Sequence, residues 1–246
     1  MRIRRQKLLF GGVLFLSTLL LYALHYYIFR DARHILIYFL GDIAFIPIEV
    51  LLVSLVIHRL LLENEKRSLL QKLNMVIGSF YSEAGTELLK LLSGYDENFE
   101  TNRRKFLISA DWNKKDFERL LKETGNMDYS PQPAAADLCS LKEFLSSKRN
   151  FILLLLENPN LMEHDAFTDL LWAILHLSEE LALRKDLRGP SRADSEHLAL
   201  DVRRAYLYLL AQWIKYMQHL KEAYPYLYSL SVRTNPFNPD ARVEIV

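Results

Sequence analysis

Two long apolar stretches occupy most of the first sixty residues and limit how this part of the chain can fold. Leu8–Phe29 carries no charged residue, and a second apolar stretch runs from Ile35 to about Leu62. A helix needs about 20 predominantly apolar residues to cross the hydrocarbon core of a bilayer. Both stretches are long enough, and the segment between them is short enough to be a turn. The sequence therefore predicts a transmembrane helical hairpin over residues 1–62, with spans at about 8–29 and 35–62.

The basic residues before Leu8 would also suit a secretory signal peptide. A signal peptide has an apolar core of about 7–15 residues, followed by small residues at the cleavage site. The first stretch here is longer than that, and it ends in the bulky sequence Tyr26-Tyr27-Ile28-Phe29-Arg30. We therefore expect the first stretch to be retained as an anchor.

The second apolar stretch is interrupted by Asp42, Pro47 and Glu49. The two acids are seven residues apart, so they lie on one face of a helix. A charged side chain at the bilayer centre costs about 2.5–3.5 kcal/mol on insertion scales. The acids therefore indicate either an ion or proton path (or a polar seam between subunits), or an interfacial Asp42 with a protonated or hydrogen-bonded Glu49. We favour the second interpretation, because two spans offer few groups to line a pore. Pro47 is expected to kink the helix one turn earlier.

Positive charge lies on the side of the hairpin away from its turn. Four basic residues precede the first span, and four others lie around the end of the second span: Arg59, Lys66, Arg67 and Lys72. The turn holds two basic residues beside one acid, which weakens the asymmetry without reversing it. Short segments rich in Lys and Arg stay on the cytoplasmic side. We therefore predict an integral protein of the inner (plasma) membrane, with the N-terminus and the C-terminal domain in the cytoplasm.

The residues that follow the hairpin have a different composition. Up to Leu62 there are seven Lys and Arg against three Asp and Glu, whereas 24 basic and 27 acidic residues follow. A mildly acidic domain lacks the basic face needed for nucleic-acid binding, so no nucleic-acid partner is expected. The single cysteine, Cys139, allows no internal disulfide and suits a reducing compartment. About 180 residues are enough for one domain with its own core.

Helical periodicity dominates this region, so the predicted fold class is all-α: the hairpin followed by a cytoplasmic helical bundle. The second span continues without a breaker into a helical stalk over residues 63–92, and the bundle covers residues 93–246. Within the bundle, Asp111 is expected to cap a helix at Trp112–Glu123, and the prolines of Gly125–Ala136 mark a loop. The remaining predicted helices are about Asp137–Ser147, Glu163–Lys185 and Asp194–Glu222. The short apolar run Phe151–Leu156 suits either a strand or a separate buried helix, and we favour the helix because no second strand is available to pair with it.

The last two long helices each carry a polar line opposite the apolar face. One line includes His176 and Glu180, and the other includes His197 and Asp201. If the lines face each other, imidazoles and carboxylates converge as they do in metal sites of helical bundles. The repeated Glu-x-x-His pair of such sites is missing. These four residues are therefore weak candidates for a metal or acid–base site, and solvated helix faces are the interpretation that we favour.

Motifs of common enzymes are missing from the sequence. It contains no Gly-x-x-x-x-Gly-Lys-Ser/Thr loop, no Gly-x-Gly-x-x-Gly turn and no Gly-x-Ser-x-Gly elbow. Nucleotide hydrolysis by a standard P-loop and serine hydrolysis are therefore set aside. We assign no cofactor and no catalytic residue, and we favour a role other than catalysis while the enzyme question stays open.

Three segments resemble those of an uncharacterised family of prokaryotic two-span inner-membrane proteins with a cytoplasmic helical domain. They are Gly41–Glu49 (GDIAFIPIE), His219–Tyr226 (HLKEAYPY) and Arg233–Phe237 (RTNPF). The resemblance implies the layout described above and brings no known activity.

These observations favour a membrane-anchored helical domain that binds a protein partner or assembles with itself, in a signalling or scaffolding role. The expected partners are the lipid bilayer and either a second copy of the chain or another protein. One alternative is an oligomeric ion or proton pathway that uses Asp42 and Glu49. Another is a membrane-tethered metal or acid–base enzyme that uses the four candidate residues of the two long helices.

Overall fold

The structure, a computed structural model, describes residues 2–96, 98–132, 134–159, 161, 164–188 and 190–244. Throughout these ranges the regular elements are helices, and the one β-type pairing among them is an isolated bridge between Asp96 and Pro131. The predicted all-α fold class is therefore confirmed. The chain divides into two compact units, Met1–Lys66 and Arg67–Val246, and the division falls inside a continuous helix.

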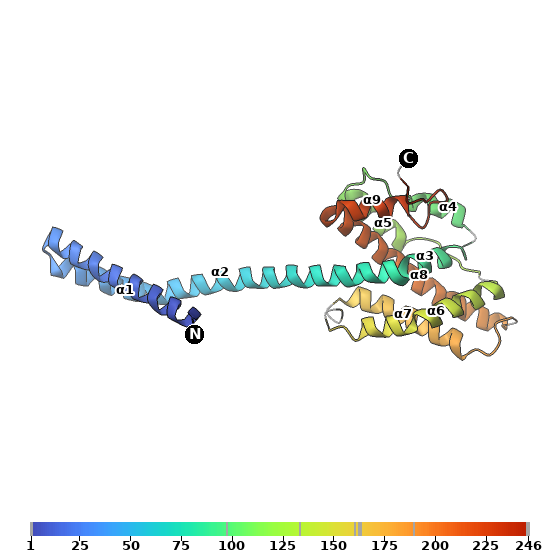
Figure 1. Cartoon of the computed structure of the whole chain (residues 1–246), viewed down its shortest axis with the longest axis horizontal. Helices are drawn as coiled ribbons and strands as arrows, with labels where there is room; N and C mark the ends of the chain where they lie inside the picture. The colour runs from blue at the N-terminus through green and yellow to red at the C-terminus, as the bar shows by residue number, and fades with distance from the viewer. Residues whose placement is uncertain are drawn as a thin grey trace. The chain divides into compact units, whose positions relative to one another are not determined.

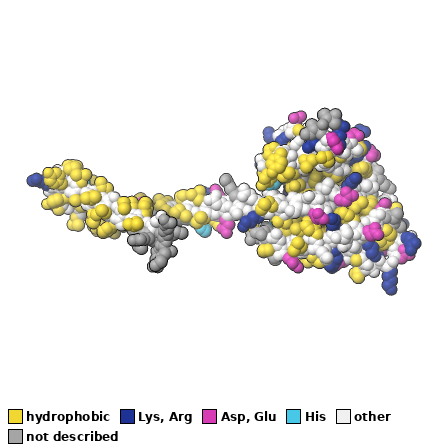
Figure 2. Space-filling view, in the orientation of Figure 1, with side chains coloured by type: hydrophobic (Ala, Val, Ile, Leu, Met, Phe, Trp, Pro, Cys, Tyr) yellow, Lys and Arg dark blue, Asp and Glu magenta, His cyan; other side chains and the backbone are white. Residues whose placement is uncertain are grey.

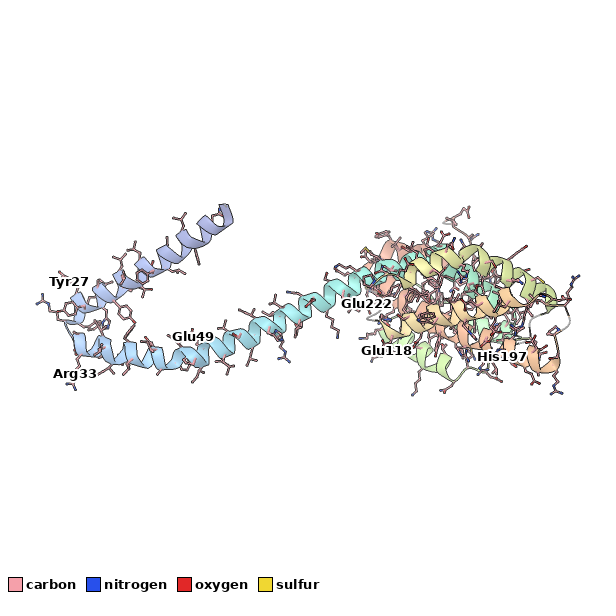
Figure 3. The ribbon with its side chains drawn as sticks, turned by 90° about the horizontal axis from the view of Figure 1, so that it is seen from below. Tyr27, Arg33, Glu49, Glu118, His197 and Glu222 are labelled. Atoms are coloured by element: carbon pink, nitrogen blue, oxygen red, sulfur yellow. The ribbon has the colours of Figure 1, made fainter. Side chains whose placement is uncertain are left out.

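The first unit is a helical hairpin formed by α1 (Arg2–Phe29) and the first part of α2 (Ala32–Phe80). The turn is made by Arg30, whose φ of 50° is left-handed, and whose N–H donates to the carbonyl oxygen of Tyr26 over 2.8 Å. Asp31 then begins α2, because its Oδ1 accepts hydrogen bonds from the N–H groups of Arg33 and His34. Tyr27 and Arg33 mark the two sides of this turn in Figure 3.

The side chains of the hairpin are mostly exposed and apolar. Tyr22 meets Phe39 edge to face at 6.3 Å, and the rings of His25 and His34 stack at 5.7 Å between centroids. Outside such contacts most described apolar side chains of both helices in this unit point outward, as its yellow surface in Figure 2 shows. Both helices are long and apolar enough to cross a membrane. Pro47 lies inside α2, which continues through it as one helix.

The second unit begins with the end of α2, which enters its core. Leu73, Ile77 and Phe80 are at most 5% exposed. The helix then widens into one π-helical turn, η1 (Tyr81–Gly85), and continues as α3 (Thr86–Ser93). We predicted that residues 63–92 form a stalk. In the structure, buried side chains from Leu73 onward belong to the hydrophobic core of the second unit.

The second unit is built around its longest helix, α8 (Arg192–Ala223). This helix packs against α3, α5 (Lys114–Gly125), α7 (Asp165–Leu183) and α9 (Pro225–Arg233), while α7 also packs on α6 (Ala135–Leu156) (Figure 1). The short helices α4 (Phe99–Arg103) and η2 (Arg104–Phe106) precede α5. The buried side chains form one hydrophobic core, to which α7 and α8 contribute most. This packing fixes the line along which α7 and α8 meet.

Two local predictions were wrong. The cap of α5 is Asn113, which forms a capping box with Asp116, and Asp111 lies before it. Residues 137–147 and 151–156 belong to the single helix α6, because the polar residues between them include Lys148 and Arg149, which lie on its surface and pair with acids of other helices. Glu163, where the next helix was predicted to begin, lies outside the described residues.

Candidate functional site

The packing of α7 on α8 brings the two predicted polar lines together. The apolar faces of both helices, among them Leu170, Ile174 and Val202, are fully buried. The residues beside these faces therefore meet at the edge of the helix pair. All four candidate residues, His176, Glu180, His197 and Asp201, lie in contact there.

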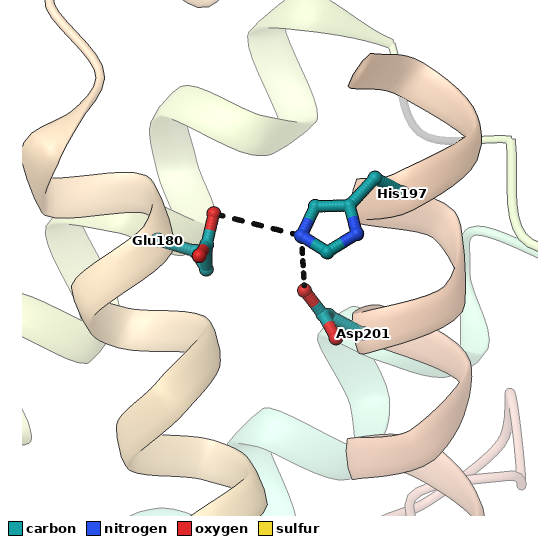
Figure 4. A group of neighbouring side chains, drawn as sticks. All are labelled: Glu180, His197 and Asp201. Carbon is teal, nitrogen blue, oxygen red and sulfur yellow. Dashed lines mark ion pairs between the residues drawn. The ribbon is translucent and has the colours of Figure 1, made fainter. Parts of the chain in front are cut away.

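Asp201 is the centre of this cluster and is only 2% exposed. Its Oδ1 accepts a hydrogen bond from Nη1 of Arg204 over 3.0 Å. Its Oδ2 lies 3.4 Å from Nε2 of His176 and 3.4 Å from Nε2 of His197 (Figure 4 draws the second contact). Neither approach is aligned as a hydrogen bond, so this buried oxygen accepts none from any described residue. A buried carboxylate oxygen in this condition is rare and needs an explanation.

Glu180 closes the cluster from α7 and is held there by Arg184. Its Oε2 lies 3.8 Å from Nε2 of His197 and accepts from Nη1 of Arg184 over 2.5 Å. Nη2 of Arg184 donates to Oδ1 of Asp194, in the first turn of α8, over 2.7 Å. The hydrogen bonds from Arg184 hold the pKa values of the Glu180 and Asp194 carboxyls below their usual range. Both carboxyls are therefore ionised at neutral pH.

The charges of the cluster favour a cation. Glu180, Asp194 and Asp201 contribute three negative charges, and Arg184 and Arg204 contribute two positive ones. With neutral imidazoles the sum is −1. The ligand atoms of Glu180, His197 and Asp201 all lie within 4.8 Å of one another. A group of nitrogen and oxygen donors as close as this could hold a metal ion.

A shallow hollow of about 260 Å³ lies beside the cluster. It is lined by Asp169, Trp172, Ala173, His176, Arg204 and Tyr208. Trp172 is 57% exposed and Tyr208 is 42% exposed, although both are large aromatic residues. His176 belongs to both the hollow and the cluster, so the two features form one continuous surface on α7 and α8.

Arg184 and Asp194 were not predicted as members of the site. Arg184 follows Glu180 by four residues on the same helix, a spacing that pairs opposite charges and is readable from the sequence. Asp194 lies across the connection between the two helices, so its pairing with Arg184 depends on the fold. The sequence carries no signal for that second contact.

The predicted seam residues lie in the hairpin unit and do not form one site there. Asp42 lines a hollow of about 230 Å³ together with Tyr22, His25, His34, Ile35 and Tyr38. Glu49 lies further along α2 and does not line this hollow (Figure 3). Nδ1 of His25 is buried without a hydrogen-bond partner among the described residues.

Comparison with known proteins places this two-part helical architecture in a class of uncharacterised helical proteins. Residues 2–61 match the model of the MJ1433 N-terminal helical domain, and residues 69–233 match that of the C-terminal helical domain of the uncharacterized protein MJ1433. The chain belongs to the MJ1433 family. The uncharacterized protein MJ1433 of Methanocaldococcus jannaschii is 44% identical over 236 residues, which cover 96% of this chain and 94% of that protein. No solved structure matches the chain.

Proposed function

We propose that this protein is anchored in the inner membrane by α1 and the first part of α2, and that its helical domain serves as a cytoplasmic binding module for a protein partner. The anchor is supported by the exposure of the apolar side chains of both helices. None of the residues in the most apolar part of either helix is buried. Exposed apolar surface in water costs about 25 cal/mol per Å². A bilayer removes this cost, and the helices satisfy their own backbone hydrogen bonds inside it.

The binding role is supported by the hollow between α7 and α8. Trp172 and Tyr208 are exposed there beside Arg204. Trp, Tyr and Arg are the residue types most enriched at the centres of protein interfaces. We therefore place the partner-binding surface on this face of the two helices.

The anchor is tested by extracting membranes from cells that express the full chain. An integral protein stays in the pellet through an alkaline carbonate wash and is released only by detergent. Release by carbonate alone would contradict the proposed anchor.

The binding surface is tested by a photoreactive amino acid placed at position 172 of the full chain in its native membrane. Crosslinked products are expected from this position. The control position is Glu118, which is exposed on α5 away from the hollow. No adduct from position 172, or equal adducts from both positions, would contradict the proposed surface.

A second candidate function is an oligomeric ion or proton pathway that uses Asp42 and Glu49. It is favoured by the hollow in which Asp42 lies with His25 and His34, since carboxylates and imidazoles exchange protons within membranes. In proteoliposomes, Asp42→Asn and Glu49→Gln should each abolish proton flux while leaving the oligomeric state unchanged. Wild-type vesicles without flux above the lipid background would exclude this function.

A further inference from the structure

We infer that the cluster between α7 and α8 binds one divalent transition-metal ion, with Glu180, His197 and Asp201 as its protein ligands. The proposed site consists only of residues of the helical domain. It is therefore independent of the proposed anchor and of the proposed protein partner.

The buried oxygen of Asp201 carries the argument. Its Oδ2 is shielded from solvent, because Asp201 is only 2% exposed. This atom also accepts no hydrogen bond from the described residues. Loss of solvation at a buried charged group costs several kcal/mol unless the group finds a partner. Arg204 satisfies the other oxygen, Oδ1, and leaves Oδ2 directed at the two imidazole nitrogens. A bound cation would give this atom the direct contact that neither imidazole provides.

Two of the three separations between donor atoms are close to those around a tetrahedral metal ion. Zinc bonds to imidazole nitrogen and carboxylate oxygen are about 2.0–2.2 Å long, so two ligands of a tetrahedral ion lie about 3.4 Å apart. Nε2 of His197 and Oδ2 of Asp201 lie 3.4 Å apart, and Nε2 of His197 and Oε2 of Glu180 lie 3.8 Å apart. His197 and Asp201 are four residues apart on α8, the spacing that places two ligands on one face of a helix.

The surrounding charges support the same conclusion. The five charged groups of the cluster sum to −1, so an added divalent cation is attracted and not repelled. Oε2 of Glu180 both accepts from Arg184 and faces His197. Arg184 does not exclude a metal ion, because a carboxylate oxygen has a second lone pair that is free for the ion. The mixed set of imidazole and carboxylate ligands suits Zn²⁺ and similar ions.

His176 has a supporting role in this arrangement. Its Nε2 approaches Oδ2 of Asp201, and its side chain is 46% exposed at the hollow. The three ligands leave one position of a tetrahedral ion open. His176 contacts the proposed ligand Asp201 from the side of the hollow.

The test uses the full-length protein, purified in detergent, stripped of metal with a chelator and titrated with Zn²⁺ by calorimetry. The expected result is one saturable Zn²⁺ per chain. His197→Ala and Asp201→Asn should each weaken this binding at least tenfold, since loss of groups that only support a metal site already costs about 10–100-fold. Co²⁺ bound at the same site should give a visible absorption spectrum that His197→Ala abolishes.

The matched control is Glu179→Gln, which removes a carboxylate next to Glu180 that faces Arg149 outside the cluster. This variant should bind Zn²⁺ as the wild type does. Circular dichroism checks the fold of each variant; if Asp201→Asn does not fold, His197→Ala decides alone, because the His197 side chain is 51% exposed. The inference is overturned if the wild type binds no stoichiometric Zn²⁺, or if His197→Ala binds it with unchanged affinity.

Discussion

The phenol of Tyr81 donates a hydrogen bond to the backbone carbonyl oxygen of Leu209 over 2.8 Å and so joins the π-helical turn η1 to the middle of α8. The Tyr81 ring also stacks on that of Tyr216 at 5.1 Å between centroids. Burial raises the pKa of the Tyr81 phenol, so the group stays a neutral donor. This contact holds the chain where α2 ends and the helical domain's core begins.

Gly85→Ala should destabilise the helical domain by about 1–3 kcal/mol, the usual cost of overpacking a core. A Cβ at this position would lie 2.6 Å from Cε1 of Phe80 and 2.7 Å from Cδ1 of Tyr81, and both rings are buried. Urea unfolding followed by tryptophan fluorescence measures the change. The control is Gly125→Ala at the exposed end of α5, where no described atom lies within 4 Å of the added Cβ. Equal stability of Gly85→Ala and the wild type would contradict the packing around η1.

Removal of the hairpin should leave a soluble helical fragment over residues 63–246. Every buried core side chain among the described residues lies at Leu73 or later, so the fragment retains the whole described core. Circular dichroism and size exclusion without detergent measure the outcome. An aggregated or unfolded fragment would show that the domain depends on the membrane or on the hairpin.

His219 should make the stability of the domain pH-dependent. Burial lowers the pKa of its imidazole in the folded state, and Nδ1 lies 3.1 Å from the amide nitrogen of Asn74, which donates to the neutral ring. An unfolded histidine has a pKa of about 6.5. The folded state therefore binds fewer protons than the unfolded state, and stability falls as the pH drops below about 6.5.

The measurement for His219 is the free energy of unfolding of the wild type and of His219→Gln across this range. The free energy of unfolding of the wild type minus that of His219→Gln should be constant above about pH 7. Below about pH 6.5 it should decrease, because the wild type loses stability there. The negative charge of Glu222 acts in the opposite direction and is the smaller influence. A difference that stays flat at all pH values would contradict the assignment.

Arg184→Gln should reduce stability at neutral pH by about 1 kcal/mol or less, because its partners Glu180 and Asp194 are partly exposed and solvent screens the pairs. Both carboxyls have pKa values lowered by Arg184. Their contribution is present above the unfolded values of about 4 and is lost as the pH falls through the lowered folded values. The effect of the substitution should therefore vanish in acid.

Urea unfolding of Arg184→Gln at neutral and acid pH measures this effect. Arg192→Gln is the control, because the Arg192 side chain is 93% exposed and its pair with Glu196 is fully solvated. The account of Arg184 is wrong if the two variants behave alike.

The long helices α7 and α8 were predictable from the sequence, and so were four residues of the cluster that joins them: His176, Glu180, His197 and Asp201. Their apolar periodicity is strong, and a short connection makes the two helices neighbours. The burial of Asp201 was not predictable. The polar line on α8 suggested solvent, whereas α8 is surrounded by α3, α5, α7 and α9, so Asp201 of that line is buried.

Other differences have equally local causes. The π-helical turn at Tyr81–Gly85 begins beside the edge-to-face contact of the Phe80 and Tyr81 rings, and it leaves no mark in a helical sequence pattern. Asp111 and Asn113 are both good N-cap residues, and the choice of Asn113 is decided by Asp116, which completes the capping box.

The most direct test of the proposed arrangement uses the single cysteine, Cys139, which is exposed on α6. A membrane-impermeant maleimide is applied to intact cells and to permeabilised cells that express the full chain. A cytoplasmic helical domain predicts labelling of Cys139 only after permeabilisation. In a Cys139→Ser background, Arg33→Cys at the hairpin turn should be labelled in intact cells. Labelling of Cys139 from outside intact cells would contradict the proposed topology.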